Sequence, residues 1–140
     1  MHMLTHIHHI NFIVRDLDAS IERYKALLGV NDDAFLFDDL PARNVSIARI
    51  KLGQTWLVLV QPKGEDGVPA AYLRKHGEGL FLLSLACPDL DLEVHRLNAE
   101  QDMVFASPER KGLDDWRVQD LETSLFSDVQ IQLTQASKDQ

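Results

Sequence analysis

Two stretches of the chain decide its fold: residues 9–28 read HINFIVRDLDASIERYKALL, and residues 82–101 read LLSLACPDLDLEVHRLNAEQ. At a constant offset of 73 positions, the difference between 82 and 9, the two Asp-Leu-Asp triplets superpose, and Arg23 matches Arg96. The apolar positions also coincide on both sides of the triplet. The sequence therefore predicts two copies of one supersecondary unit.

Each copy opens with a strand that leads into a helix cap. Residues 7–14 are rich in β-branched and aromatic side chains, and residues 80–87 are similar once leucine is admitted, which favours a strand in both places. Asp16 and Asp89 follow, and an aspartate at this position caps the first turn of a helix. The repeat therefore begins as strand, cap and helix.

Helical periodicity follows both caps. Apolar residues recur at spacings of three and four, which predicts helices over 17–28 and 89–99 with one apolar face each. A short third helix is expected over 69–76, ending at Gly77. The segment that contains it separates the two copies.

The remaining strand-like runs complete each copy in the order β-α-β-β-β. The runs expected as strands are 34–37, 44–52 and 55–61 in the first copy, and 101–105, 116–121 and 129–134 in the second, whereas 122–128 has no clear pattern. We predict a single α+β domain over 1–140, made of module 1 (about 5–63) and module 2 (about 79–135), joined by a linker with the short helix.

Composition restricts the class of protein and its partners. The 140 residues carry 45% apolar and 26% charged side chains and a formal net charge of −8. The acidic balance disfavours a nucleic acid as partner, and no apolar run approaches the ~20 residues of a membrane span. The single cysteine, Cys87, fits a reducing compartment, so we expect a cytoplasmic protein. Exposed sheet edges favour a homodimer.

Few side chains of the sequence suggest a catalytic or metal-binding role by themselves. His6 and His8 share one face of the first strand and His9 the other, so the three cannot chelate a metal from one regular strand. Cys87 precedes Pro88 at the end of a buried strand, where a thiol is usually a packing residue. The chain has no P-loop, no GxGxxG and no GxSxG motif. Whether Met1 and His2 are native cannot be read from the sequence.

Four segments resemble a known family. They are HHINFIVRDLDASIERYKALLG near the N-terminus, NVSIARIKLGQTWLVLVQP, PAAYLRKHGEGL, and IQLTQ near the end. With the tandem repeat they resemble the vicinal oxygen chelate superfamily of glyoxalases, bleomycin-resistance proteins and dioxygenases, and above all its methylmalonyl-CoA epimerase branch. The resemblance implies a glyoxalase-like fold, in which the two modules form a curled-sheet half-barrel around a cup.

The resemblance also implies where a metal would bind. Metal-dependent members use a histidine on the first strand, a Glu or Gln ending module 1, and a histidine and a glutamate from module 2. These positions fall on His9, Val58, Leu82 and Gln132. Aliphatic side chains offer no donor atom, so no metal cofactor is expected, with His9 and Gln132 as the only remaining candidate ligands.

Strand alternation predicts the lining of the cup. The expected ligand-binding residues are His9, Asn11, Ser46, Trp56, Val58, Val60, Leu82, Ser84, Gln130 and Gln132. Such an apolar lining with a few polar groups suits a small organic ligand. Trp56 would either stack on a planar group or fill the space of the missing metal.

Three functional hypotheses remain open at this point. The first is a metal-independent small-molecule-binding protein of the glyoxalase/bleomycin-resistance type. The second is an isomerase or lyase of the glyoxalase/methylmalonyl-CoA epimerase type, which would use His9 as general base or an atypical divalent metal site. The third is a structural homodimer whose cup is filled by its own side chains. The sequence names neither the ligand nor the dimer geometry, nor does it say whether a reaction is catalysed.

Overall fold

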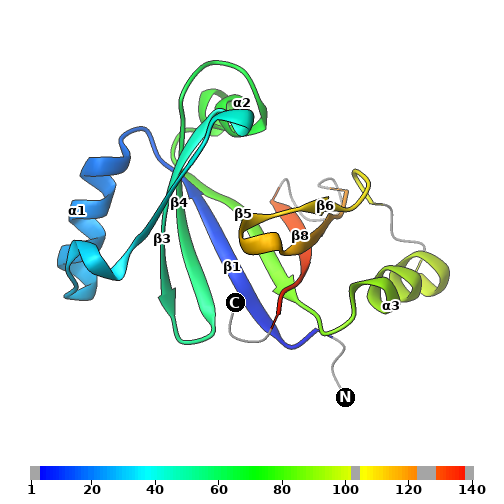
Figure 1. Cartoon of the computed structure of the whole chain (residues 1–140). Coiled ribbons are helices and arrows are strands. Elements are labelled where there is room, and N and C mark those ends of the chain that lie inside the picture. Colours follow the sequence, from blue (N-terminus) through cyan, green and yellow to red (C-terminus); the bar gives the residue numbers. More distant parts are fainter. Residues whose placement is uncertain (1–3, 102–104, 123–128, 138–140) are drawn as a thin grey trace. The chain divides into compact units, whose positions relative to one another are not determined.

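The computed structural model describes residues 4–101, 105–122 and 129–137 of the chain (Figure 1). The chain divides into two compact units. The N-terminal unit is Ile10–Phe81, and the C-terminal unit comprises Met1–His9 and Leu82–Gln140.

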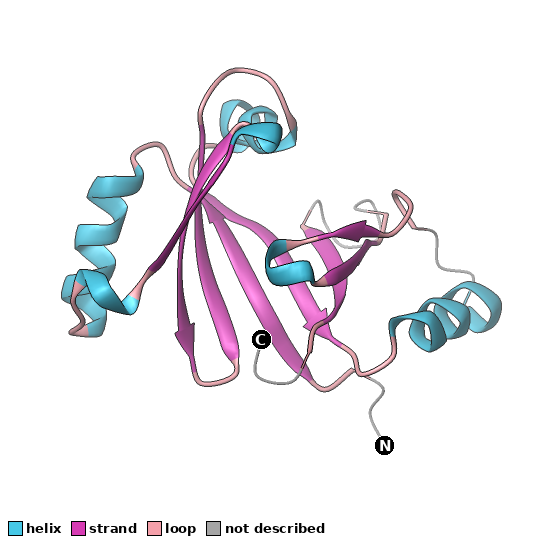
Figure 2. Ribbon diagram, viewed as in Figure 1, coloured by secondary structure: helices cyan, strands magenta, loops and turns pink. Residues whose placement is uncertain are grey.

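The N-terminal unit is a small sheet with two helices, coloured by secondary structure in Figure 2. Its elements are β1 (His6–Ile13, from Ile10 on), α1 (Leu17–Leu28), β2 (Leu36–Leu40), β3 (Val45–Leu52), β4 (Thr55–Pro62) and α2 (Val68–His76). The strand order is β2-β3-β4-β1, and β3 is antiparallel to both β2 and β4. Short 3-10 turns at Asp32–Ala34 and Pro41–Arg43 flank β2.

The C-terminal unit repeats this plan with shorter strands. Its elements are β5 (Gly79–Ala86, from Leu82 on), α3 (Leu90–His95) with a π-helical extension (Arg96–Glu100), β6 (Arg110–Lys111), β7 (Arg117–Asp120) and β8 (Gln130–Gln135). A 3-10 turn, Leu113–Asp115, joins β6 to β7. The strand order is β5-β8-β7-β6, with β8 parallel to β5 and antiparallel to β7.

The three expected helices are confirmed as α1, α2 and α3 with its extension. The prediction of a strand over 34–37 is partly wrong, because a 3-10 turn ends at Ala34 and the strand begins only at Leu36. The run 101–105 falls largely on residues 102–104, and the unassigned stretch on 123–128, and both lie outside the described residues. Strand β6 was not predicted. It has only two residues, which are too few to show an alternating pattern, and it is defined by its pairing with β7.

The N-caps expected from the repeat are confirmed in both units. The carboxylate of Asp16 accepts a hydrogen bond from the backbone N–H of Ala19 at 3.1 Å. Asp89 accepts from the N–H of Leu92 at the same distance. The two helices therefore begin with the same capping interaction.

A second pair of hydrogen bonds ties each helix to the last strand of its unit. The Gln61 Oε1 atom accepts from the backbone N–H of Leu17 at 2.7 Å, and the Gln135 Oε1 atom accepts from Leu90 at 2.7 Å. Both N–H groups belong to the first turn of a helix, where backbone N–H groups have no acceptor within the helix itself. These amides hold α1 against the end of β4 and α3 against the end of β8.

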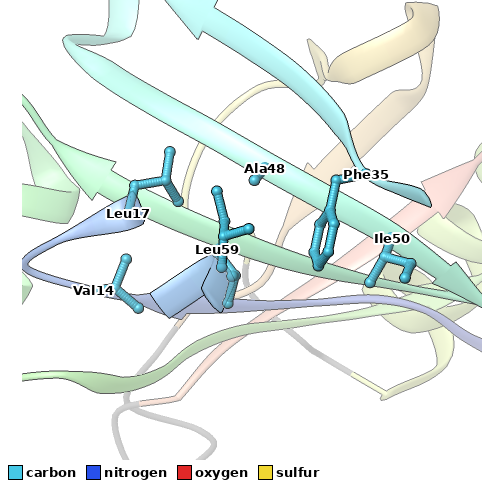
Figure 3. Close-up of a cluster of buried hydrophobic side chains, with 7 residues drawn as sticks. Val14, Leu17, Phe35, Ala48, Ile50 and Leu59 are labelled. Carbon is cyan, nitrogen blue, oxygen red and sulfur yellow. The ribbon is translucent and has the colours of Figure 1, made fainter. Parts of the chain in front are cut away.

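Each helix covers one face of its own sheet. In the N-terminal unit (Figure 3) the buried cluster under α1 consists of Val14, Leu17, Ile21, Phe35, Ala48, Ile50 and Leu59. In the C-terminal unit the corresponding cluster is Cys87, Leu90, Leu97, Leu121 and Leu133. Because side chains alternate along a strand, the residues between these positions lie on the opposite face, where the candidate site is found.

Replacing Gln61 by methionine tests the tie between helix and strand. The Gln61→Met variant keeps the size of the side chain but leaves the Leu17 N–H without its acceptor. We expect the free energy of unfolding to fall by about 1 kcal/mol, as measured by urea denaturation. Gln54→Met, in the exposed β3–β4 turn, is the control and should leave stability unchanged. Equal stability of both variants would show that the amide does not hold the helix.

Candidate ligand-binding site

The register of β3 against β4 defines the open face of the N-terminal unit. Arg49 pairs with Val58, and Lys51 pairs with Trp56. These residues alternate with Ala48, Ile50 and Leu59 of the core under α1. Trp56 and Val58 were expected on this face, and the structure places both there, with Val58 only 1% exposed.

Ser46 lies on the other face, contrary to the parity expectation. It has the same parity as Ala48 and Ile50, which α1 covers, and it pairs with Gln61. Its hydroxyl donates a hydrogen bond to Asp39 at 3.1 Å. The β3–β4 register pairs residues of opposite parity, such as Arg49 with Val58, so Ser46 cannot share a face with Val58, although the sequence prediction placed both on one face.

Arg49 is a site residue that the sequence analysis missed. It is buried, with 3% of its surface exposed, and its guanidinium carbon lies 4.4 Å from the centroid of the Trp56 ring. Its Nε atom lies 3.5 Å from the Asp38 carboxylate, and the Lys51 ammonium lies 5.5 Å from the same indole ring. An arginine in the middle of a strand, directly between the apolar residues Ala48 and Ile50, was the signal that could have revealed it.

The polar atoms of this unit that are buried without a hydrogen-bond partner among the described residues include one donor and one acceptor on the open face. They are the indole Nε1 of Trp56, an obligate donor, and the Oδ1 of Asn11, an acceptor. Asn11 alternates with Phe12, which packs on the α1 cluster, so it lies on the open face of its strand. Buried polar groups are normally paired, so both atoms mark positions where a ligand could bind.

In the C-terminal unit, His8 and His9 share a hydrogen bond and an aromatic neighbour. Their Nδ1 atoms are 2.9 Å apart, so one ring donates and the other accepts. The His9 ring stacks on Trp116 with a centroid separation of 5.0 Å, and His8 meets the same indole edge-on at 4.5 Å. Alternation had assigned the two imidazoles to opposite faces, but packing against Trp116 brings them together. Because the Nδ1 atom of His9 is hydrogen-bonded to His8, His9 would contact a ligand through its Nε2 atom.

A buried carboxylate organises the open face of the C-terminal unit. Asp120 accepts hydrogen bonds from the side-chain amides of Gln130 at 2.8 Å and Gln132 at 3.0 Å. The Nε of Arg110 donates to it at 2.9 Å. Asp120 is 4% exposed and pairs with Gln132 in the β7–β8 register. Asp120 was not expected in the site, because the sequence does not show which face of the strand 116–121 is buried.

The network continues through hydroxyl groups to β5. Thr134 donates to the Gln132 Oε1 atom at 3.4 Å and hydrogen-bonds Ser84. Ser84 pairs with Gln132 in the β5–β8 register, and Leu82 pairs with Gln130. The structure therefore brings Ser84, Gln130 and Gln132 together, as expected, around a carboxylate that was not expected.

The residues at the four family ligand positions do not fit a divalent metal. Val58 and Leu82 are buried aliphatic side chains without a donor atom. The amide nitrogen of Gln132 donates to Asp120, and its oxygen accepts from Thr134. Among the described residues, no group of three or more His, Cys, Asp or Glu side chains could hold a metal ion. One imidazole and one engaged amide make a poor donor set.

No helix in the described ranges is long and apolar enough to cross a membrane.

The comparisons with known proteins identify the family. The family model of the Glyoxalase/Bleomycin resistance protein/Dioxygenase superfamily matches residues 8–119, and the chain belongs to this family. The mitochondrial methylmalonyl-CoA epimerase of Homo sapiens is 32% identical over 96 residues, which cover 69% of this chain and 50% of the human protein. The chain thus spans about half the length of that curated relative.

Solved structures confirm the fold. A Streptomyces coelicolor methylmalonyl-CoA epimerase variant in complex with 2-nitronate-propionyl-CoA is 26% identical, with a TM-score of 0.84 over 96% of this chain and 99% of that one. The Mycobacterium tuberculosis epimerase is 24% identical, with a TM-score of 0.84 over 97% of this chain and 91% of that one. The glyoxalase-like α+β fold with tandem β-α-β-β-β modules, expected from the repeat and the resemblance, is therefore correct.

Cys87 provides a test of the packing in the C-terminal unit. Burial in the α3 cluster raises the pKa of its thiol to about 12, and Glu93 and Asp89 add to the rise. Because only the thiolate is nucleophilic, we expect Cys87 to resist 5,5′-dithiobis(2-nitrobenzoate) in the native protein near neutral pH and to react fully in guanidinium chloride. Rapid reaction in the native protein would contradict this packing.

Proposed function

We propose that the protein binds a small organic molecule without a metal ion, on the open faces of its sheets. The observation that carries the proposal is the donor set at the family's ligand positions, where Val58 and Leu82 replace ligating side chains and Gln132 is engaged by Asp120 and Thr134. On the open face of the N-terminal unit the residues available to a ligand include Asn11, Arg49 and Trp56. On the open face of the C-terminal unit, taken by itself, they include His9, Ser84, Gln130 and Gln132.

The open faces have the composition of a binding site. They combine buried apolar side chains with a few polar groups, which is the usual make-up of small-molecule sites. Trp56 and Asn11 each present a buried polar atom without a partner among the described residues, and a ligand would supply the missing hydrogen bonds. A fully packed structural face would be expected to pair such atoms internally.

A second function has one specific observation in its favour. Asp120 gives the C-terminal unit a buried carboxylate, bound to Gln132, in the unit that also holds His9. A carboxylate and an imidazole are the groups that general acid–base catalysis requires. Because the relatives are methylmalonyl-CoA epimerases, the alternative is an isomerase that moves a proton α to a carbonyl.

Metal analysis tests the leading proposal. We expect protein purified without chelator to contain far less than one equivalent of Zn, Mn, Co or Ni by inductively coupled plasma mass spectrometry. The reason is that a neutral site with only two protein ligands binds a divalent ion little more favourably than water does. One equivalent of metal per chain, lost in His9→Ala but kept in His95→Ala on α3, would overturn metal-independent binding.

Isotope exchange tests the alternative. Under the leading proposal, methylmalonyl-CoA incubated with the protein in D₂O gains no deuterium at its α-carbon above the rate without protein, as read by mass spectrometry. Exchange that persists after chelator treatment and is lost in both His9→Ala and Asp120→Asn would replace the binding proposal with the isomerase. Arg23→Met on the exposed surface of α1 is the control variant.

A further inference from the structure

The open face of the N-terminal unit holds a buried hydrogen-bond donor and a buried acceptor on neighbouring strands. Trp56 belongs to β4 and Asn11 to β1, and these two strands lie side by side in the sheet (Figure 1). The backbone N–H of Val14 donates to the Val60 carbonyl at 2.9 Å and joins the two strands within this unit. Both side chains therefore belong to one face of one sheet.

The indole N–H of Trp56 has a fixed chemical requirement. An indole Nε1 can only donate a hydrogen bond. This atom is buried and has no hydrogen-bond partner among the described residues, and the residue as a whole is 8% exposed. Burying a donor without an acceptor is unfavourable, so a molecule bound here would have to present an acceptor atom to this N–H.

The position of Arg49 favours a contact at the edge of the indole over stacking on its face. The guanidinium carbon of Arg49 lies 4.4 Å from the centroid of the Trp56 ring. A planar ligand stacked on that side of the ring would have to displace the arginine. The Nε1–H lies in the plane of the ring and points outward from its edge, so it can donate while the guanidinium stays in place.

Asn11 supplies the complementary group. Its Oδ1 atom is also buried without a hydrogen-bond partner among the described residues, and a carbonyl oxygen can only accept. By alternation, the same face carries the buried side chains of Ile13, Val58 and Val60. These aliphatic groups cannot pair with either polar atom, but they suit the apolar part of a small organic ligand.

We propose that Trp56 and Asn11 form a recognition site for the amide group of a small, uncharged organic molecule. The carbonyl oxygen of the ligand accepts from the Trp56 Nε1–H, and the amide N–H of the ligand donates to the Asn11 Oδ1. An amide holds an acceptor and a donor in one rigid plane without a net charge. This inference rests on the proposed metal-independent binding and names the class of ligand.

The test compares carboxamides with ketones of the same shape. Benzamide and isobutyramide are titrated into metal-free, ¹⁵N-labelled protein beside acetophenone and isopropyl methyl ketone, in which a methyl group replaces the NH₂ group. NMR follows the indole N–H signals. The chain has two tryptophans, so Trp116 is an internal control and Trp56→Phe assigns the signals. We expect the amides to shift the Trp56 signal saturably, with little effect on Trp116, and to bind about fivefold more tightly than the ketones.

Variants assign each contact to its atom, with affinities measured by isothermal titration calorimetry. Asn11→Leu removes the acceptor at nearly constant volume, so it should abolish the preference for amides and leave ketone binding unchanged. Trp56→Phe removes the donor, so it should weaken amides and ketones by the same factor, about fivefold. Asn31→Leu changes an exposed asparagine of the same unit whose side chain makes no cap hydrogen bond, and it should bind like the wild type. The wild-type comparison of amide with ketone decides the matter even where a variant does not fold.

The possible failures are distinguishable. Equal affinity for amides and ketones would overturn amide recognition and leave metal-independent binding intact. Tighter binding of benzoate than of benzamide would show that Asn11 turns its amide nitrogen inward, and would overturn amide recognition as well. A Trp56 shift that requires added Zn²⁺ or Co²⁺ would overturn both proposals. No shift with either amide would overturn the amide site alone, because the proposed function is tested separately by the metal content.

Discussion

The alternation of side chains along each strand is the constraint on which the rest of the structure depends. One helix covers one face of each sheet, anchored by the hydrogen bonds from Leu17 to Gln61 and from Leu90 to Gln135. Once those faces are buried, every intervening residue lies on the opposite face. The same constraint that builds the two cores therefore selects the side chains available to a ligand, and it acts in both units because the underlying sequence unit is repeated.

Much of the fold could be predicted from the sequence, because the repeat signals are local. An aspartate cap followed by helical periodicity is readable from a few residues, and the helices and caps are where they were expected. The faces of the strands were harder to predict, since the β3–β4 register pairs residues of opposite parity, and Ser46 was assigned to the wrong face. Arg49 and Asp120 were missed because a charged residue in a strand is usually exposed, and their burial depends on partners that only the folded chain brings together.

Both open faces hold buried charges close to positions where the metal-dependent relatives have ligands. Beside Val58 the charge is the Arg49 guanidinium, paired with Asp38 and lying over Trp56. Beside Gln132 it is the Asp120 carboxylate, held by Arg110 and two glutamines. Buried charges are expensive unless they are paired and hydrogen-bonded. Their presence opposite the helix-covered cores therefore supports the proposal that these faces recognise a ligand.

The most direct measurement is a Co²⁺ titration of the ¹⁵N-labelled protein, in which NMR follows the imidazole signals of His9. Paramagnetic Co²⁺ strongly shifts the resonances of any residue that ligates it. If the chain recognises its ligand with its own side chains, the His9 signals will move no more than those of the histidine on α3, His95, and no saturation will occur. Large, saturating shifts of His9 at one equivalent of Co²⁺, absent from His95, would show that the metal site survives and would contradict metal-independent recognition.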